Sequence, residues 1–245
     1  MGKNINLFFN KFNSIPYLDN ADYTQIDLII QIAESIVNMT GLGVYIFDYH
    51  KKGVIYLSKN IPKWFGLPDT ICSDYEAYLQ YIPEEDFNML VEINNAVFEF
   101  WSKLSTTHYE KYTVSYDFRF KGFMVHQHYA PLFIDNGKIW LSMCIVSLSA
   151  RKKTGNVIMN ASDSNFHYEY SLKSKRWMPK KNVSLTEREK NIIRFCAQGL
   201  SVKQIAEIVS VGYETIKSQK KKIFEKLGVT SVEEMVSCAM NDCLM

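Results

Sequence analysis

Three copies of one helix-start signal lie close together in the C-terminal part of the chain. Each is a Ser or Thr followed three residues later by Glu or Gln. This is the spacing of a capping box, in which each side chain accepts a hydrogen bond from the other residue's backbone N–H. Apolar residues at helical spacing follow each signal. The three pairs are Thr186–Glu189, Ser201–Gln204 and Ser231–Glu234. Because little chain separates them, residues 183–245 are predicted to form a compact domain of four helices.

The fourth helix is predicted between the second and the third signal. Gly212 is an acceptable N-cap residue, and Gly228 follows the last apolar position, where glycine often ends a helix. Its apolar residues cluster on one side of a helical wheel: Ile216, Ile223, Phe224 and Leu227. The opposite side carries Glu214, Ser218, Lys221 and Glu225, with Lys217 and Lys222 on its flanks.

Two short helices followed by a longer basic helix are typical of a helix-turn-helix motif. The major groove of DNA, about 12 Å wide, accepts one α-helix. Lysines on the exposed face of such a helix can neutralise phosphates and donate hydrogen bonds to guanine. A lysine run on its own is more often a solvated face, so the prediction of DNA binding rests on the complete motif.

Several short segments of this region also match a known family without gaps. They are Leu185–Glu189, Ala197–Ser201 with Lys203, Ile205–Ala206, Thr215–Lys217 and Lys226–Val229. Over residues 183 to 243 they resemble the LuxR-type helix-turn-helix. The resemblance implies a bacterial transcriptional regulator that binds a specific double-stranded operator as a homodimer, with RNA polymerase as a candidate partner.

The resemblance also implies roles for individual residues. Three of them would face base edges, namely Lys217, Ser218 and Lys221. Two would contact phosphates, namely Lys203 and Thr215, and Lys222 on the flank of the long helix joins them as a candidate DNA contact. Glu189 would be a structural acid that pairs with a basic side chain. Gly212 and Gln219 stand where the family usually has Ser and His, so the base preference of relatives does not transfer.

The distribution of charge agrees with two separate roles. Residues 1–150 hold 11 Lys and Arg against 16 Asp and Glu, a net charge of −5, whereas residues 151–245 hold 17 against 10, a net charge of +7. The basic part points to a polyanionic partner. The acidic part should be repelled from DNA, which suits a domain that senses a signal or dimerises.

The acidic part opens with an N-terminal extension over residues 1–39. Apolar residues recur at helical spacing over 24–39, which predicts an amphipathic helix. Its apolar stripe is too wide for a free surface helix, so the helix should dock on its own sheet or on a second copy of the chain. We therefore predict a homodimer.

Residues 40–148 alternate between strand and helix signals. Strands are predicted at 44–48, 54–58, 112–120, 123–133 and 138–148, with helices over 60–104 and a turn at 135–137. This order resembles a PAS domain, and Tyr81–Asp86 is similar to the His-Pro-Asp-Asp segment of that family. The resemblance implies a five-stranded antiparallel sheet with helices on one face. The fold class is therefore predicted as α+β, with a generic α+β sensor domain as the alternative.

Residues 149–182 have the composition of a linker, with a small hairpin over Phe166–Trp177 that turns at Lys173–Ser174. They would connect the PAS-like domain to the DNA-binding domain.

One strand of the PAS-like domain has an aromatic face. Tyr112, Tyr116, Phe118 and Phe120 share that face and are candidates to line a cavity for an unknown small ligand. Ordinary core packing explains them equally well. No cofactor is predicted. The helix over 84–104 has no His where PAS relatives that bind haem have their ligand, and the Asn-Cys-Arg-Phe-like segment of PAS relatives with flavin photochemistry does not occur in the sequence.

The other residue patterns mainly exclude functions. Five cysteines without a CxxC pair argue against a disulfide framework and a zinc site, and favour a reducing, cytoplasmic location. His126 and His128 are expected to face solvent or an interface rather than a metal. No apolar stretch approaches the ~20 residues needed to span a bilayer, so no membrane partner is expected.

No catalytic motif occurs in the sequence, so no catalytic residue is predicted and the protein is expected not to be an enzyme. Two alternative functions stay open. The helical domain could be a protein-interaction adaptor that does not bind DNA, or the aromatic cavity could serve an enzyme.

Overall fold

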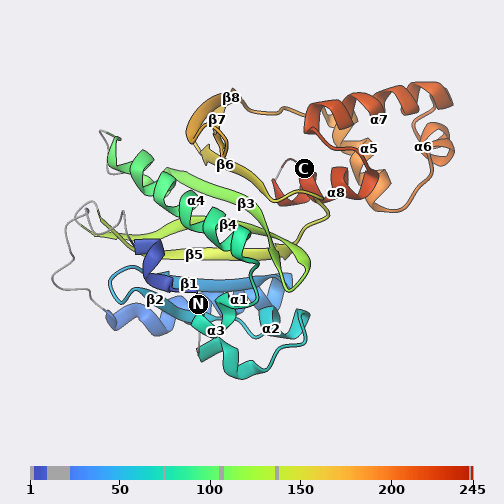
Figure 1. Ribbon diagram of the computed structural model, residues 1–245. Coiled ribbons are helices and arrows are strands. Elements are labelled where there is room, and N and C mark those ends of the chain that lie inside the picture. Colours follow the sequence, from blue (N-terminus) through green and yellow to red (C-terminus); the bar gives the residue numbers. More distant parts are fainter. Residues whose placement is uncertain are drawn as a thin grey trace. The chain divides into compact units, whose positions relative to one another are not determined.

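The structure, a computed structural model, describes residues 3–9, 23–73, 75–104, 108–135, 138–242 and 244. The chain forms two compact units (Figure 1). The first comprises residues 1–148 and 153–180, and the second comprises residues 149–152 and 181–245. The turn predicted at 135–137 includes Asn136 and Gly137, which lie outside the described residues.

The first unit is built on one antiparallel sheet, whose eight described strands follow the order β2-β1-β5-β4-β3-β6-β7-β8. The strands are β1 (Gly43–Asp48), β2 (Gly53–Leu57), β3 (Tyr112–Phe120), β4 (Phe123–Asp135), β5 (Lys138–Leu148), β6 (Gly155–Ala161), β7 (Phe166–Ser171) and β8 (Arg176–Lys181). Most neighbouring strands in the sheet are also consecutive in the sequence. The exceptions are the pairs β1–β5 and β3–β6.

The predicted count of five strands is wrong, because the region predicted as a linker supplies β6, β7 and β8. The asparagines of β6 suggested a linker, but they alternate with buried residues: Val157 and Met159 pack into the core while Asn156 is exposed. β6 pairs with β3 and thereby extends the sheet. The small hairpin is present, since β7 ends at Ser171, β8 begins at Arg176 and the N–H of Lys175 donates to the carbonyl of Ser171.

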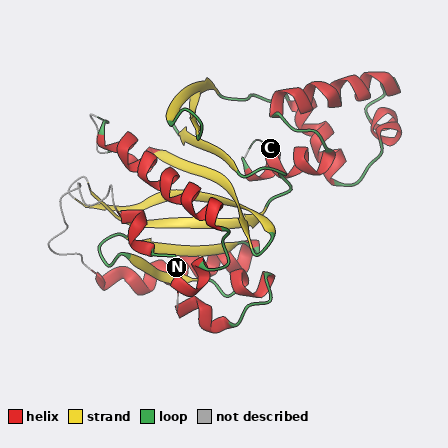
Figure 2. Cartoon of the chain, in the orientation of Figure 1, coloured by secondary structure: helices red, strands yellow, loops and turns green. Residues whose placement is uncertain are grey.

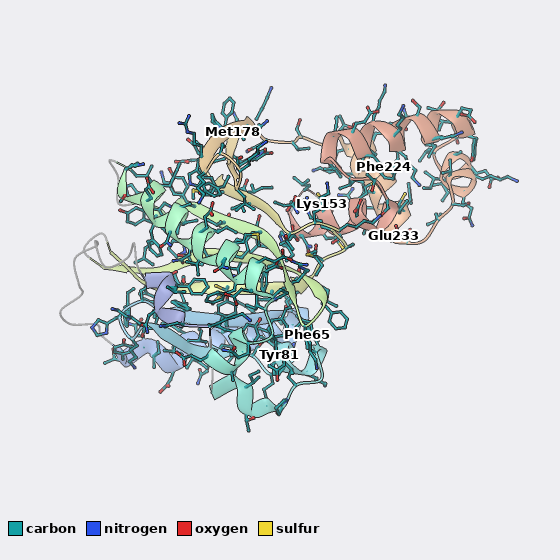
Figure 3. The ribbon with its side chains drawn as sticks, viewed as in Figure 1. Phe65, Tyr81, Lys153, Met178, Phe224 and Glu233 are labelled. Atoms are coloured by element: carbon teal, nitrogen blue, oxygen red, sulfur yellow. The ribbon has the colours of Figure 1, made fainter. Side chains whose placement is uncertain are left out.

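The main core lies between the sheet and helix α4 (Glu84–Ser102), which runs across one face of the sheet (Figure 2). The helices α2 (Asn60–Trp64) and α3 (Tyr75–Leu79) close one end of this core. Phe120 at the end of β3 stacks on Tyr78 and contacts Phe65, with Tyr81 beside it (Figure 3). Each buried side chain of this size contributes about 1.5–3 kcal/mol to folding.

The opposite face of the sheet is covered by helix α1 (Ile26–Thr40). Ile29, Ala33 and Val37 pack on Val44 and Ile46 of β1, whose neighbours Tyr45 and Phe47 point into the main core. The helix predicted over residues 24–39 thus docks on its own sheet through one side of its apolar stripe, which is one of the two alternatives predicted for it. It adds a second helical layer from outside residues 40–148, the region for which the PAS resemblance implied helices on one face.

An acidic residue in the first turn of α4 fixes that helix to β3. The carboxylate of Asp86 is buried and accepts hydrogen bonds from Arg119 through Nη2 at 2.6 Å and Nε at 3.1 Å. It also accepts one from the Arg119 backbone N–H. The same guanidinium contacts Glu85, whose side chain is 71% exposed.

The second unit consists of α5 (Glu187–Ala197), α6 (Val202–Ile208), α7 (Tyr213–Leu227) and α8 (Val232–Asn241) around one apolar core. The capping boxes at Thr186 and Ser201 are complete, as predicted. The third is only half formed. The Ser231 hydroxyl accepts from the Glu234 N–H, but the Glu234 carboxylate accepts from Thr230 instead of Ser231.

The first prediction concerns the anchor between α4 and β3. Asp86→Asn should lower the free energy of unfolding of the first unit by about 2–3 kcal/mol. The Arg119 guanidinium then no longer has a charged, buried carboxylate to accept its hydrogen bonds. All four tryptophans lie in the first unit, so urea denaturation followed by tryptophan fluorescence reports on that unit. Glu85→Gln is the matched control and should have a smaller effect, since its carboxylate is exposed. Equal losses would contradict this account.

Candidate nucleic-acid interface

Helices α6 and α7 are joined by a tight turn. The N–H of Val211 donates to the carbonyl of Ala206, and Ser210 has a φ of 53°, in the left-handed region. Gly212 is the N-cap of α7, as predicted, and offers no side-chain hydrogen bond to the helix. Gly228, with a φ of 64°, ends the helix through a hydrogen bond to the carbonyl of Phe224.

Burial divides α7 into two faces. Ile216, Ile223 and Leu227 are buried in the core of the unit. The exposed side chains include every predicted contact on this helix: Thr215, Lys217, Ser218, Lys221 and Lys222. At 100° per residue, Ser218 and Lys221 lie close to the centre of this exposed face, Lys217 lies to one side, and Thr215 and Lys222 lie to the other. Lys203 is exposed in the first turn of α6.

Acidic residues accompany the lysines of the exposed face. Lys217 Nζ lies 3.8 Å from Glu214 Oε2, and Lys221 Nζ lies 3.9 Å from Glu225 Oε1. Both separations exceed the 2.7–3.2 Å of a hydrogen bond, and all four side chains are at least 64% exposed. These ion pairs therefore hold the lysines only loosely, and their ammonium groups stay available to another anion.

Glu189 is a structural acid, as predicted. Lys226 Nζ donates to its carboxylate at 2.8 Å, and Thr186 donates through both its backbone N–H and its hydroxyl. Burial on its own would raise the pKa of Glu189, but these hydrogen bonds outweigh it and hold that pKa below its ordinary value. Lys226 thus ties the last turn of α7 to the start of α5.

Two further polar residues of α7 turn toward the interior of the unit. Lys220 is half-buried, and its charge is among the causes that lower the pKa of Glu233 in α8, after the backbone and Ser231 hydrogen bonds to that carboxylate. Figure 3 labels Glu233 and Phe224 on their helices. Gln219 Oε1 is buried and has no hydrogen-bond partner among the described residues. Both positions lie next to the apolar side of α7 on a helical wheel.

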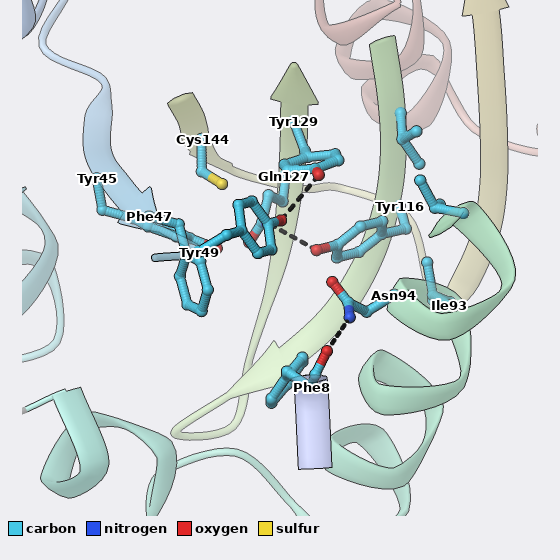
Figure 4. Close-up of a pocket in the computed structure, with 12 residues that line it drawn as sticks. Phe8, Tyr45, Phe47, Tyr49, Ile93, Asn94, Tyr116, Gln127, Tyr129 and Cys144 are labelled. Atoms are coloured by element: carbon cyan, nitrogen blue, oxygen red, sulfur yellow. Dashed lines mark hydrogen bonds between the residues drawn. The ribbon is translucent and has the colours of Figure 1, made fainter. Parts of the chain in front are cut away.

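The first unit holds a cavity of about 40 Å³ between the sheet and α4 (Figure 4). A water molecule needs about 10–15 Å³ on the same measure, so the cavity admits a few waters or a small molecule. Its polar groups come from β3, from β4 and from Tyr49, which directly follows β1. The hydroxyls of Tyr49 and Tyr129 lie 2.8 Å apart, and Gln127 Nε2 donates to the Tyr116 hydroxyl. Burial raises the pKa of Cys144 in its wall to about 12, so the thiol stays neutral.

Only one of the four aromatic residues predicted for a cavity lines it. Tyr116 does, whereas Tyr112 packs edge-on against Phe100, and Phe118 and Phe120 belong to the packed core. Four further lining residues were not predicted from the sequence: Tyr49, Asn94, Gln127 and Tyr129. The alternating pattern shows which face of a strand a residue occupies, but it carries no information on which part of that face stays open.

The histidine pair is not a solvent-facing pair. The His126 side chain is only 2% exposed, with Nδ1 3.0 Å from Asp117 Oδ1 and Nε2 3.2 Å from His128 Nε2. Asp117 is on β3 and pairs across the ladder with His126 on β4. In the described part of the chain, no group of three His, Cys, Asp or Glu side chains is arranged to hold a metal ion.

Comparisons with known proteins place the second unit in a family. Residues 183–239 match the family model described as GerE, bacterial regulatory proteins of the luxR family. The Fimbriae Z protein of Salmonella typhimurium is 36% identical over 64 residues, which is 26% of this chain and 30% of that protein. The chain thus matches less than a third of the length of that curated relative. The match covers the same region as α5–α8, so the second unit contains a luxR-family helix-turn-helix domain.

Two solved structures are similar to this chain over most of its length. The phage VqmA–DPO complex is 14% identical and covers 89% of this chain and 88% of that chain, with a TM-score of 0.30. The Vibrio cholerae VqmA dimer in the absence of target DNA is 12% identical and covers 91% and 89% of the two chains, with a TM-score of 0.31. Separately, none of the described helices combines the length and the apolar character needed to cross a bilayer.

The second prediction concerns the Glu189–Lys226 pair. Glu189→Gln should lower the stability of the second unit at pH 7 by about 1–2 kcal/mol, because a charge-assisted hydrogen bond is removed. Hydrogen exchange of the α5 and α7 amides, read by mass spectrometry, measures this. Because the folded-state pKa is lowered, the wild-type advantage should exist above the ordinary glutamate pKa of about 4.3 and vanish as the pH falls through the folded value.

Glu187→Gln is the matched control for this measurement, since Glu187 lies in the same turn with a 74% exposed side chain. It should leave the exchange of both helices unchanged. Faster exchange in the Glu187 variant than in the Glu189 variant would contradict the assignment.

Proposed function

We propose that the chain is a sequence-specific DNA-binding transcriptional regulator whose helix α7 enters the major groove. The observation that carries this proposal is the exposed polar face of α7 inside a luxR-family segment. Burial of Ile216 and Ile223 turns that face outward, where its N-terminal half is accessible to base edges.

Each exposed residue takes the role that its position supports. Lys217, Ser218 and Lys221 contact base edges, because they lie on or beside the centre of the exposed face. Thr215 and Lys222 lie on its flank and contact phosphates, and Lys203 does the same from the first turn of α6, where backbone N–H groups also favour anions.

The third prediction tests this interface. Lys217→Ala combined with Lys221→Ala should weaken binding to an operator selected by the wild-type protein from a random duplex library, by about 1–3 kcal/mol for each lysine that no longer reaches a base edge. Fluorescence anisotropy over a salt series measures the change in affinity. Lys59→Ala with Lys63→Ala is the matched control, because both residues are exposed, share the same i, i+4 spacing and lie in the first unit. Unchanged binding by the α7 variant would favour the adaptor function instead.

We further propose that the first unit is a PAS-like domain through which two copies of the chain associate. The exposed side of α1 carries Leu28, Ile32 and Met39, which are 55%, 50% and 78% exposed and lie along one stripe at helical spacing. A second copy of α1 would bury this stripe, and the dimer would present two α7 helices to two operator half-sites.

The fourth prediction tests the association. The wild-type protein should have twice the mass of one chain by light scattering, and Leu28→Glu with Ile32→Glu should reduce it to the mass of one chain. Gln31→Glu with Asn38→Glu adds the same charge to exposed positions of α1 beside the stripe and should leave the dimer intact. A dimer that survives the stripe variant would place the interface elsewhere.

We also propose that the cavity behind Tyr116 receives a small polar ligand. The phenol groups of Tyr49, Tyr116 and Tyr129 and the amide of Gln127 offer both donors and acceptors between apolar walls, which is the usual composition of a small-molecule site. Occupancy of this cavity would bias the arrangement of the dimer and thereby the operator affinity.

The fifth prediction tests the cavity. Native mass spectrometry of the purified protein should show a bound molecule that denaturation releases. Tyr116→Phe should weaken its retention, because the variant has no hydroxyl to accept from Gln127. Tyr112→Phe changes the same strand outside the cavity and should have no effect. A protein that retains no molecule, and gains none from a metabolite extract, would limit the first unit to dimerisation.

A further inference from the structure

A carboxylate lies at the centre of the exposed face of α7, at the end that would meet the bases. Glu214 is the second residue of the helix, and its side chain is 80% exposed. At 100° per residue it aligns with Ser218 and Lys221, so a helix that binds DNA through this face brings Glu214 into the groove.

A negative charge at this position needs a reason, because DNA phosphates repel it. Carboxylates in a first turn stabilise helices through the helix dipole. That effect requires only a position in the first turn, which Tyr213 and Thr215 also occupy. The helix dipole therefore does not explain why Glu214 lies at the centre of the exposed face of α7 and not at its edge.

The neighbour of Glu214 suggests what it recognises. Lys217 Nζ lies 3.8 Å from Glu214 Oε2, which is too far for a hydrogen bond. The carboxylate acceptors of Glu214 and the ammonium donors of Lys217 therefore lie side by side without a hydrogen bond between them. A C·G base pair presents the complementary pattern at its major-groove edge. The cytosine N4 amino group is a donor, and guanine O6 and N7 are acceptors.

We propose that Glu214 reads a cytosine by accepting a hydrogen bond from its N4 amino group, while Lys217 donates to the guanine of the same base pair. This inference rests on the proposed insertion of α7 into the major groove. It makes Glu214 a residue that determines specificity and at the same time reduces affinity for all other sequences.

A second acidic residue of the same stripe provides a matched control. Glu225 is 65% exposed and pairs with Lys221 at 3.9 Å, much as Glu214 pairs with Lys217. It lies eleven residues further along the helix, about 16 Å at 1.5 Å per residue, in the part of the helix that leaves the bases. Glu225 is therefore expected to repel DNA without reading a base.

The experiment selects binding sequences from a random duplex library with the full-length wild-type protein, Glu214→Gln and Glu225→Gln. The wild-type selection should contain a C·G pair whose replacement by T·A weakens binding at least fivefold by anisotropy. Glu214→Gln should lose that preference at this one position and move it toward adenine, because glutamine pairs with adenine N6 and N7. Glu225→Gln should select the wild-type sequence.

Other outcomes would overturn the inference. If both variants select the wild-type sequence and only bind all DNA more tightly, Glu214 acts through charge alone. If the wild-type protein selects a sequence in which no position requires a C·G pair, the cytosine assignment is wrong while the DNA-binding function stands. If the wild-type protein selects no sequence at all, the proposed function fails, and the role of Glu214 fails with it.

Discussion

The rotation of α7 about its own axis decides which residues of the second unit face outward. Ile216 and Ile223 are fully buried and lie two helical turns apart on one side, so the core holds the helix at two points along its length. Turning the helix by a third of a revolution would expose both side chains and cost about 1.5–3 kcal/mol for each. The stripe from Glu214 to Glu225 faces solvent because the isoleucines face inward.

The ends of α7 are held as firmly as its middle. Its N-terminus follows a tight turn closed by the Val211–Ala206 hydrogen bond, and its last turn is tied to the start of α5 by Lys226 and Glu189. A helix held at both ends and through its core presents its lysines at defined positions. Recognition of a base edge depends on such positions, since hydrogen bonds tolerate errors of only a few tenths of an ångström.

The first unit shows where local patterns mislead. The period of two in β3 was visible because its residues alternate aromatic with polar, but β6 hid the same period behind asparagines that suggested a linker. β6 becomes a strand because β3 offers an unpaired edge, and backbone groups buried at that edge require partners. The partner of an edge strand is a property of the whole sheet and cannot be deduced from seven residues of sequence.

The sequence by itself determined the elements whose hydrogen bonds are local. Capping boxes, glycine ends and helical periodicity involve residues within four positions of one another, so α5, α6 and α7 and the outward residues of α7 could be predicted. Only the tertiary structure decided the eight-stranded sheet, the docking of α1 on its second face, and the cavity between Tyr49, Tyr116 and Tyr129. Each of these depends on contacts between segments far apart in the chain, where packing of the whole unit selects among many arrangements that local patterns allow equally.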